Sequence, residues 1–282
     1  MPTPHTYQRI RVESVAPALG AEVTGVSLGT NDNETLREIE QAFNEYSVLV
    51  FRNQTLTADE QIRFTRHFGE VQRHPLYRSA VLDGHPEILV LQHKDGQYIN
   101  GRNDMWHSDI TFAEKPPLGS VLYCKAATTG LGDTQFCSMR RAYESLSAGL
   151  KKSLGGLRAE HSARKMAKIN NSRAYNVPIT DVPPPVLHPV VRLHPGSGLP
   201  SLFVNPIYTM ALEGMTEPES DALLVPLYRE ATRTENVYRH RWHVDDVVMF
   251  DNRCTMHYVV PDYGPETHRL MHRTTAAGDR PS

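Results

Sequence analysis

The chain has few cysteines, no long hydrophobic run and no excess of positive charge. Its 282 residues include three cysteines, Cys124, Cys137 and Cys254, which are widely spaced and odd in number. Such cysteines argue against a disulfide framework and favour reduced thiols, so we expect a cytoplasmic protein.

Two further classes of protein are disfavoured by what is missing. No apolar run approaches the roughly 20 residues that a membrane-spanning helix requires, and the opening MPTPHTYQRIRVES lacks the apolar core of a signal peptide. The formal net charge of −2 gives no reason to expect a nucleic-acid partner. Histidine, in contrast, is abundant, with 14 copies, and it is a common metal ligand.

Hydrophobic patterning predicts a mainly β chain with flanking helices. Helices are expected over 31–47 with Asn33 as the cap, over 57–69, as a pair within 139–156, and over 218–232. Strands are expected over 48–51, 87–92, 106–112, 119–125, 134–139, 186–195, 201–206, 238–244, 246–252 and 269–277. This pattern favours a β-sandwich or jelly roll in a single domain over 1–282. The polar, proline-rich stretch 165–185 is expected to be a surface excursion that acts as a lid.

The stretch WHSDITF, residues 106–112, carries the first candidate site. In a strand, residues two apart point to the same face, so His107 and Asp109 would project together. They are either a buried ion pair or two of the three ligands of a metal site. The spacing alone is weak evidence, because His-x-Asp/Glu also occurs at 85/87, 93/95 and 243/245. Only the pair at 107/109 lies in an alternating run bracketed by aromatic residues.

A third ligand and an anion site are suggested nearer the C-terminus. Non-haem Fe(II) oxygenases hold iron with two histidines and one carboxylate and leave the other face open. His257, just past the hydrophobic run DVVMF, is the best third ligand, with His272 and His268 as alternatives. Arg269 and Arg273 share one face of a predicted strand. They either bind anions there or are solvated cations on an edge strand.

Six motifs occur in an order and spacing typical of one enzyme family. They are WHSDITF, GLGDTQF, LRAEHSARK, LHPVVRLHP, DNRCTMHYVVPDY and HRLMHRTTAAGDRP. Over residues 15–281 the chain closely resembles the taurine dioxygenase family of Fe(II)/2-oxoglutarate-dependent dioxygenases. The resemblance implies a double-stranded β-helix, or jelly roll. It also implies a dioxygenase that requires Fe(II), 2-oxoglutarate as co-substrate and O2. A non-catalytic metal-binding jelly roll is the remote alternative.

The resemblance also implies roles for individual residues. The residues that match the iron ligands are His107, Asp109 and His257. Arg269 and Thr134 match the residues that bind the distal carboxylate of 2-oxoglutarate, an anion suited to the arginine fork. The implied reaction hydroxylates a substrate C–H bond while 2-oxoglutarate is converted to succinate and CO2.

The residues that match the substrate site favour a small organosulfonate such as taurine, which would give an aldehyde and sulfite. These residues are His74, Tyr77, Asn103, Tyr208 and Arg273, the last matching the arginine that holds the anionic head. Tyr208 replaces a phenylalanine of the taurine enzyme, however, and Met166 and Ala167 replace a serine and an aromatic residue. The small Ala167 leaves room for the alternatives, which are a larger sulfonate, an alkyl sulfate ester or an aryloxyalkanoate.

The resemblance bears on partners as well. Relatives form dimers or tetramers, so we expect a homo-oligomer. The expected ligand is a small anionic organic substrate, and neither nucleic acid nor a membrane is expected as a partner.

Overall fold

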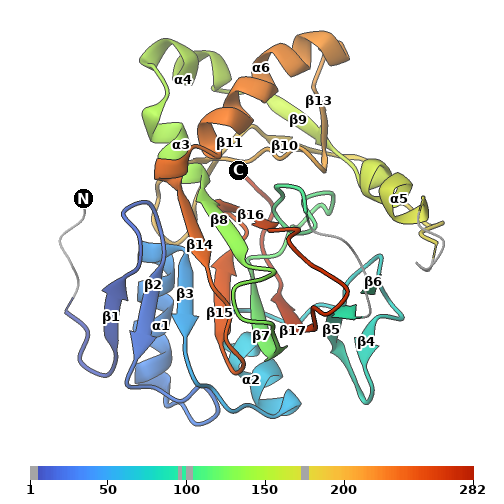
Figure 1. The fold of residues 1–282 in the computed structure, drawn as a ribbon. Helices are drawn as coiled ribbons and strands as arrows, with labels where there is room; N and C mark the ends of the chain where they lie inside the picture. The colour runs from blue at the N-terminus through green and yellow to red at the C-terminus, as the bar shows by residue number, and fades with distance from the viewer. Residues whose placement is uncertain (1–5, 95–96, 100–103, 173–177) are drawn as a thin grey trace.

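A nine-stranded sheet forms the centre of the molecule (Figure 1). The structure, a computed structural model, describes residues 6–94, 97–99, 104–172 and 178–282. In spatial order the sheet contains β1 (Arg11–Ser14), β2 (Ala21–Thr24), β3 (Val48–Phe51), β15 (Val247–Asp251), β7 (Gly119–Ala126), β17 (Arg269–Ala276), β5 (His85–Lys94) and β4 (Val81–Leu82), with β6 (Gln97–Ile99) beside β5. Neighbouring strands are antiparallel except β2 and β3.

The central sheet is covered on both faces. On one face lies a three-stranded antiparallel sheet of β14 (Val237–His240), β8 (Thr134–Ser138) and β16 (Thr255–Val259). Buried side chains of both sheets, among them Leu122, Val248 and Phe136, form one core cluster. On the other face, Phe43 and Phe64 pack with Leu49 and Val121. These two phenylalanines belong to α1 (Asn33–Tyr46) and α2 (Ala58–Phe68). Strand β15 is therefore buried along its whole length, as an inner strand packed on both faces should be.

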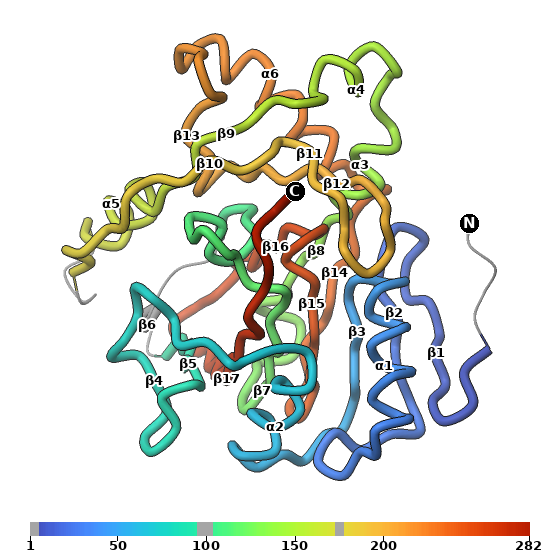
Figure 2. The backbone as a smooth tube through the Cα atoms, turned by 180° about the vertical axis from the view of Figure 1, so that it is seen from behind, coloured from blue at the N-terminus to red at the C-terminus, as the bar shows by residue number. Residues whose placement is uncertain are grey.

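A helical layer with short strands lies above the sheets in the view of Figure 1. Its helices are α3 (Met139–Ser145), α4 (Ala148–Leu154), α5 (Arg164–Asn171), α6 (Glu217–Ala231) and the 3-10 turn η1 (Thr234–Asn236). Its strands are β10 (Val186–Pro189), β9 (Arg158–His161) and β13 (Thr209–Leu212) in one sheet, and β11 (Val191–Leu193) with β12 (Pro200–Leu202) in another. Seen from behind, α5 projects away from the rest of this layer (Figure 2).

The predicted mainly β chain with flanking helices is confirmed, and the predicted helices are present. Two local predictions are wrong. The cap of α1 is Asp32, whose carboxylate accepts a hydrogen bond from the backbone of Thr35, and Asn33 is the first helical residue. Residues 106–112 do not form a strand, because only His107 makes a β-bridge and a turn follows it. The first part of the expected excursion over 165–185 is occupied by α5.

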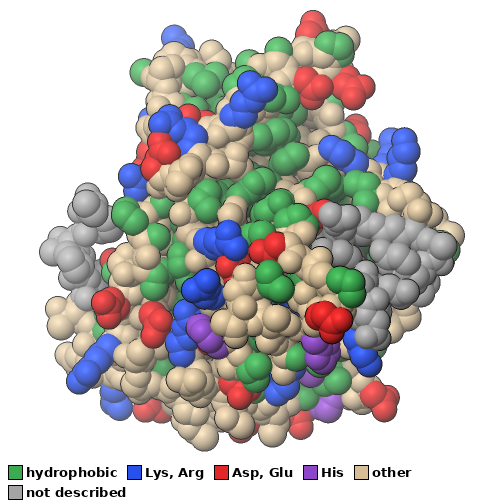
Figure 3. All heavy atoms as spheres, viewed as in Figure 1, with side chains coloured by type: hydrophobic (Ala, Val, Ile, Leu, Met, Phe, Trp, Pro, Cys, Tyr) green, Lys and Arg blue, Asp and Glu red, His purple; other side chains and the backbone are tan. Residues whose placement is uncertain are grey.

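Two surface properties bear on the expected partners. Among the described residues, no helix combines the length and the apolar composition that crossing a membrane requires. On the face seen in Figure 3, basic and acidic side chains are interspersed in small groups.

Candidate active site

His107 and His257 lie side by side although they are far apart in the sequence. An isolated antiparallel bridge joins them, with backbone hydrogen bonds of 3.0 Å from His107 N to His257 O and 2.7 Å in return. Their ring centroids are 4.1 Å apart. Strand β16 carries His257, so pairing of the backbone places both imidazoles on the same side of the small sheet.

Asp109 reaches the two imidazoles from a turn. The chain reverses after His107, and Ile110 adopts a left-handed conformation with φ of 52°. The carboxylate Oδ1 lies 3.8 Å from Nε2 of His107 and 3.9 Å from Nε2 of His257. The ligand atoms of the three residues all lie within 4.8 Å of one another, and all three residues are buried. His107 and Asp109 do lie together as expected, but a turn and not strand alternation brings them together.

The protonation of this cluster suits a divalent cation. Burial raises the pKa of Asp109, but Arg273, followed by the two histidines, outweighs it and holds that pKa below its ordinary value. Burial lowers the pKa of His107 and lowers that of His257 well below its ordinary value. An ionised carboxylate and two neutral imidazoles are the forms that bind metals.

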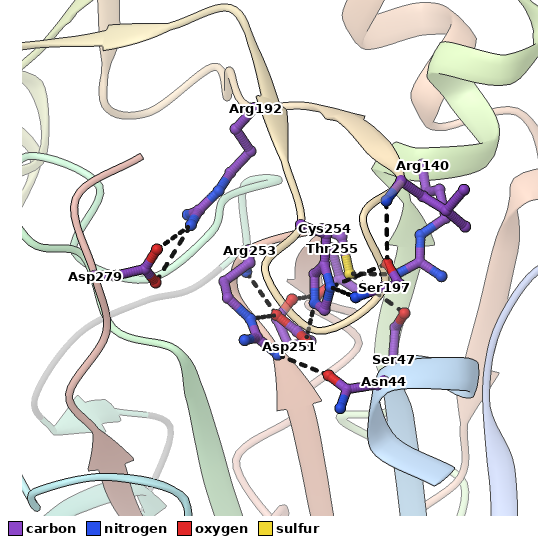
Figure 4. A network of polar contacts seen from close by, with 12 residues as sticks. Asn44, Ser47, Arg140, Arg192, Ser197, Asp251, Arg253, Cys254, Thr255 and Asp279 are labelled. Atoms are coloured by element: carbon purple, nitrogen blue, oxygen red, sulfur yellow. Dashed lines mark hydrogen bonds and ion pairs between the residues drawn. The ribbon is translucent and has the colours of Figure 1, made fainter. Parts of the chain in front are cut away.

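A second group with metal-ligand chemistry is a structural ion-pair network (Figure 4). It contains His194, Asp251 and Cys254, all buried. Both oxygens of Asp251 accept hydrogen bonds from Arg253, at 2.9 Å and 2.6 Å, and Nε2 of His194 donates another over 2.9 Å. Burial raises the pKa of the Cys254 thiol to about 11. Arg253 engages both carboxylate oxygens of Asp251, so the negative charge of this group is already neutralised by a side chain of the protein.

Two arginines of β17 point into the same interior. Arg269 and Arg273 are 7% and 4% exposed, and β17 lies between β7 and β5, so the alternative of solvated cations on an edge strand is wrong. Among the described residues, Nε and Nη2 of Arg269 have no hydrogen-bond partner. The Cζ atom of Arg269 lies 5.8 Å from the centroid of the Trp242 ring. Trp242 in turn donates a hydrogen bond from Nε1 to the hydroxyl of Thr134 over 2.9 Å. A buried guanidinium with free donors is suited to an anionic ligand.

Two of the predicted substrate residues, His74 and Tyr208, lie near Arg273 and Asp109. Nδ1 of His74 accepts hydrogen bonds from the backbone of Leu76 and Tyr77, both 3.1 Å. Burial, together with the positive charge of Arg273, lowers the pKa of His74 to about 3, so its ring is neutral and carries its proton on Nε2. Tyr208 is buried, with its ring 6.3 Å from that of His107. Asn103 lies outside the described residues.

An apolar cluster adjoins the polar groups. Its buried members are Ile110, Phe112, Ala163, Met166, Ile207 and Tyr208, with Leu76, Met105, Ala113, Ile169 and Val182 packed against them. Ala167, also buried, lies on the same helix as Met166. Phe112 and Ile207 were not predicted as site residues. The aromatic bracket at Phe112 was the available signal, whereas nothing in the sequence around Ile207 distinguishes it. A separate surface cavity of about 410 Å³, between β9, β10 and β13, is lined by none of the predicted site residues.

Comparison with known proteins agrees with this geometry. The model of the family "Taurine catabolism dioxygenase TauD, TfdA family" matches residues 11–275. The chain belongs to this family. An alpha-ketoglutarate-dependent 2,4-dichlorophenoxyacetate dioxygenase of Cupriavidus pinatubonensis is 37% identical over 277 residues, which are 93% of this chain and 96% of the relative. An alpha-ketoglutarate-dependent sulfate ester dioxygenase of Pseudomonas putida is 34% identical, with 99% and 92% covered. The crystal structure of a taurine dioxygenase from Burkholderia xenovorans has a TM-score of 0.82 at 33% identity, with 97% and 91% covered.

Membership defines the chemistry of this dioxygenase. It is an Fe(II)/2-oxoglutarate-dependent enzyme that uses Fe(II), 2-oxoglutarate and O2. The residues present fit these groups. Two neutral imidazoles and one ionised carboxylate match the donor set of non-haem iron, and the free donors of Arg269 match a carboxylate of the co-substrate.

Proposed function

We propose that this dioxygenase hydroxylates an amphipathic organic anion, and that an aryloxyalkanoate is its preferred class. One observation carries the proposal. The buried guanidinium of Arg273 and the neutral imidazole of His74 adjoin an apolar cluster that contains the rings of Phe112 and Tyr208. A carboxylate head would bind the cation, and an aromatic tail would pack among the rings. The 37% identical relative that acts on 2,4-dichlorophenoxyacetate supports this class.

An alkyl sulfate ester is the second candidate. The same arginine would hold a sulfate head, and the Pseudomonas putida relative is named for sulfate esters. Taurine, the first expectation from the sequence, is favoured less. A short, doubly charged zwitterion would leave the apolar cluster unfilled, and two named relatives act on larger anions.

We assign the iron to His107, Asp109 and His257, and the distal carboxylate of 2-oxoglutarate to Arg269 and Thr134. With 2-oxoglutarate and O2, the iron supplies oxidising chemistry that places one oxygen atom in a substrate C–H bond and converts the co-substrate to succinate and CO2. The chain holds the target carbon toward this centre. Hydroxylation of the carbon that bears an ether oxygen gives a hemiacetal, which breaks down to a phenol and an oxo acid.

The remaining polar residues orient the substrate. Arg273 neutralises the anionic head, and His74 donates from Nε2 because its Nδ1 already accepts two backbone hydrogen bonds. Tyr77 and Tyr208 flank the head group, with the Tyr77 ring 4.8 Å from that of His74. Asn103 is assigned to the substrate by the family resemblance alone.

The architecture proposed for this function is a double-stranded β-helix in one domain over 1–282, with 165–185 as a lid. Helix α5 opens that segment and carries Met166 into the apolar cluster, with Ala167 buried beside it on the same helix, which supports a covering role. We also propose a homo-oligomer, a dimer or tetramer, that acts on a small organic anion without a nucleic-acid or membrane partner.

The proposal is tested with a panel of phenoxyacetates, alkyl sulfates and taurine. Succinate release is measured for each, together with phenol, aldehyde or sulfite. We expect phenol and succinate in equal amounts from a phenoxyacetate. The Arg269→Ala variant, which should release neither, controls for adventitious oxidation. Sulfite from taurine without phenol from any phenoxyacetate would overturn the assignment of substrate class but leave the dioxygenase chemistry in place.

A further inference from the structure

The two oxygens of the Asp109 carboxylate have different surroundings. Oδ1 faces the imidazoles of His107 and His257 at 3.8 Å and 3.9 Å, and it accepts a hydrogen bond from Nη1 of Arg273 over 2.9 Å. Oδ2 accepts a hydrogen bond from the hydroxyl of Ser120 over 2.8 Å. Ser120 is fully buried, so no water competes for that oxygen from its side.

A closed ring of hydrogen bonds fixes this orientation. The amide Nδ2 of Asn252 donates to Oγ of Ser120 over 3.2 Å, and the backbone N–H of Asp109 donates to Oδ1 of Asn252 over 3.0 Å. Because Asn252 supplies a proton to the serine oxygen, the single hydroxyl proton of Ser120 is directed at Asp109. The three residues thus hold the aspartate by both its side chain and its backbone.

Both supporting residues sit on rigid parts of the fold. Ser120 lies in β7, paired with Phe250 of β15 on one side and Thr275 of β17 on the other. Asn252 lies directly after β15, and its backbone N–H donates to the carbonyl of Leu118 over 3.0 Å.

The residues on either side of Asn252 are also fixed. They are Asp251 and Arg253, which form a buried ion pair (Figure 4). Asp251 also contacts His194, over 2.9 Å. That network therefore stabilises the turn that presents the Asn252 amide. The same turn leads into β16 and its His257, so one structural element controls two of the three metal ligands.

We propose that Ser120 and Asn252 are positioning residues which restrict Asp109 to one-oxygen coordination of the metal. Oδ2 is engaged by Ser120, so Oδ1, which also accepts a hydrogen bond from Arg273, is the oxygen turned toward the two imidazoles. A carboxylate that used both oxygens would occupy one more position, which the co-substrate and O2 require. Groups of this kind typically contribute 10–100-fold to metal affinity.

The proposal rests on the metal site assigned above, and the test separates the two. Co(II), a spectroscopic substitute for Fe(II), is titrated into the full-length protein, and its affinity and visible absorption are recorded. His107→Ala should abolish binding, and failure to do so would contradict the metal site itself. For Ser120→Ala we expect a 10–100-fold weaker affinity, because the carboxylate is no longer held in its orientation. We also expect a changed visible spectrum, because Oδ2 is released to coordinate.

Matched variants exclude a merely structural effect. Ser201→Ala also removes a buried strand hydroxyl, one that donates to the backbone carbonyl of Leu202 over 3.3 Å, and should bind Co(II) like the unmodified protein. Asn252→Ala should weaken binding as Ser120→Ala does, and the double variant should lose little more than either, since the ring acts as a unit. The Asn252→Ala variant also provides the test if Ser120→Ala does not fold. Unchanged affinity and spectrum in a folded Ser120→Ala or Asn252→Ala variant would overturn the proposal.

Discussion

Arg273 donates a hydrogen bond from Nη1 to Oδ1 of Asp109 over 2.9 Å, and this is the carboxylate oxygen that faces both imidazoles of the cluster. The group assigned to the substrate head and the oxygen assigned to the metal are therefore in direct contact. Substitution of the arginine should affect both.

For Arg273→Gln we expect the KM for the organic anion to rise about 10–100-fold, since a charge-assisted hydrogen bond contributes about 1.5–3 kcal/mol. Arg273 also lowers the pKa of Asp109. Loss of Arg273 should raise that pKa, so Asp109 becomes protonated at a higher pH. As the pH is lowered, Co(II) binding should therefore be lost at a higher pH than in the unmodified protein. Arg280→Gln, at an exposed ion pair with Glu114, is the control. Steady-state kinetics and Co(II) titrations from pH 4 to 7 measure both effects, and an unchanged KM would remove Arg273 from the substrate site.

His257→Ala should abolish Co(II) binding and turnover while far-UV circular dichroism stays close to that of the unmodified protein. The reason is that a facial site needs all three ligands. His272→Ala is the matched control, because His272 points to the opposite side of β17 from Arg273 and is only partly buried. Retained metal binding in His257→Ala would move the third ligand to another histidine.

Arg269→Lys should raise the KM for 2-oxoglutarate about tenfold or more and leave the KM for the organic anion nearly unchanged. An ammonium cannot reproduce the two-pronged contact of a guanidinium with a carboxylate. Succinate formation at varied co-substrate concentration measures the effect. Should the organic anion be affected instead, the roles of Arg269 and Arg273 would have to be exchanged.

Ala167→Phe should distinguish the substrate classes. The side chain is buried on α5, beside the apolar cluster, so a phenyl ring there would take the volume assigned to an aromatic tail. We expect turnover of a phenoxyacetate to fall at least tenfold, whereas a small sulfonate should be tolerated. Ala163→Ser, a small change in the same cluster, controls for general disturbance. Equal phenol release by Ala167→Phe and the unmodified protein would place the tail elsewhere.

Acid should destabilise the protein through His161. Burial lowers its pKa to about 3, whereas in the unfolded chain it is about 6.5. Between these values the unfolded chain binds more protons, so the free energy of unfolding falls as the pH drops. From pH 7 to pH 5 this histidine should account for a loss of about 2 kcal/mol. In urea denaturation, His161→Gln should lose less stability over this range than the unmodified protein, whereas the exposed His268→Gln should show the full loss.

The order of the sequence motifs predicted much of the candidate site, whereas the predicted local secondary structure contributed less. The motif order identified His107, Asp109 and His257, and the structure brings them together. The argument from strand alternation was nevertheless wrong, because the left-handed conformation of Ile110 ends the extended segment. A β-branched residue with positive φ is rare, so no local pattern predicts this turn.

The residues that support the site were harder to find. Ser120 lies in an ordinary hydrophobic strand, and its importance comes from a hydrogen bond to another segment. Asn252 ends a strand, where asparagine is common for reasons of turn geometry alone. Such residues are specified by tertiary contacts, which hydrophobic periodicity does not encode.

The backbone bridge between His107 and His257 also bears on when the cluster assigned to the iron can first form. On the ribosome, a nascent chain that has exposed residues 107 and 109 still lacks the strand that completes the cluster. Domains fold as units, so the metal centre should form only as the last part of the chain emerges. Incomplete chains therefore lack the third member of the ligand set assigned to the iron.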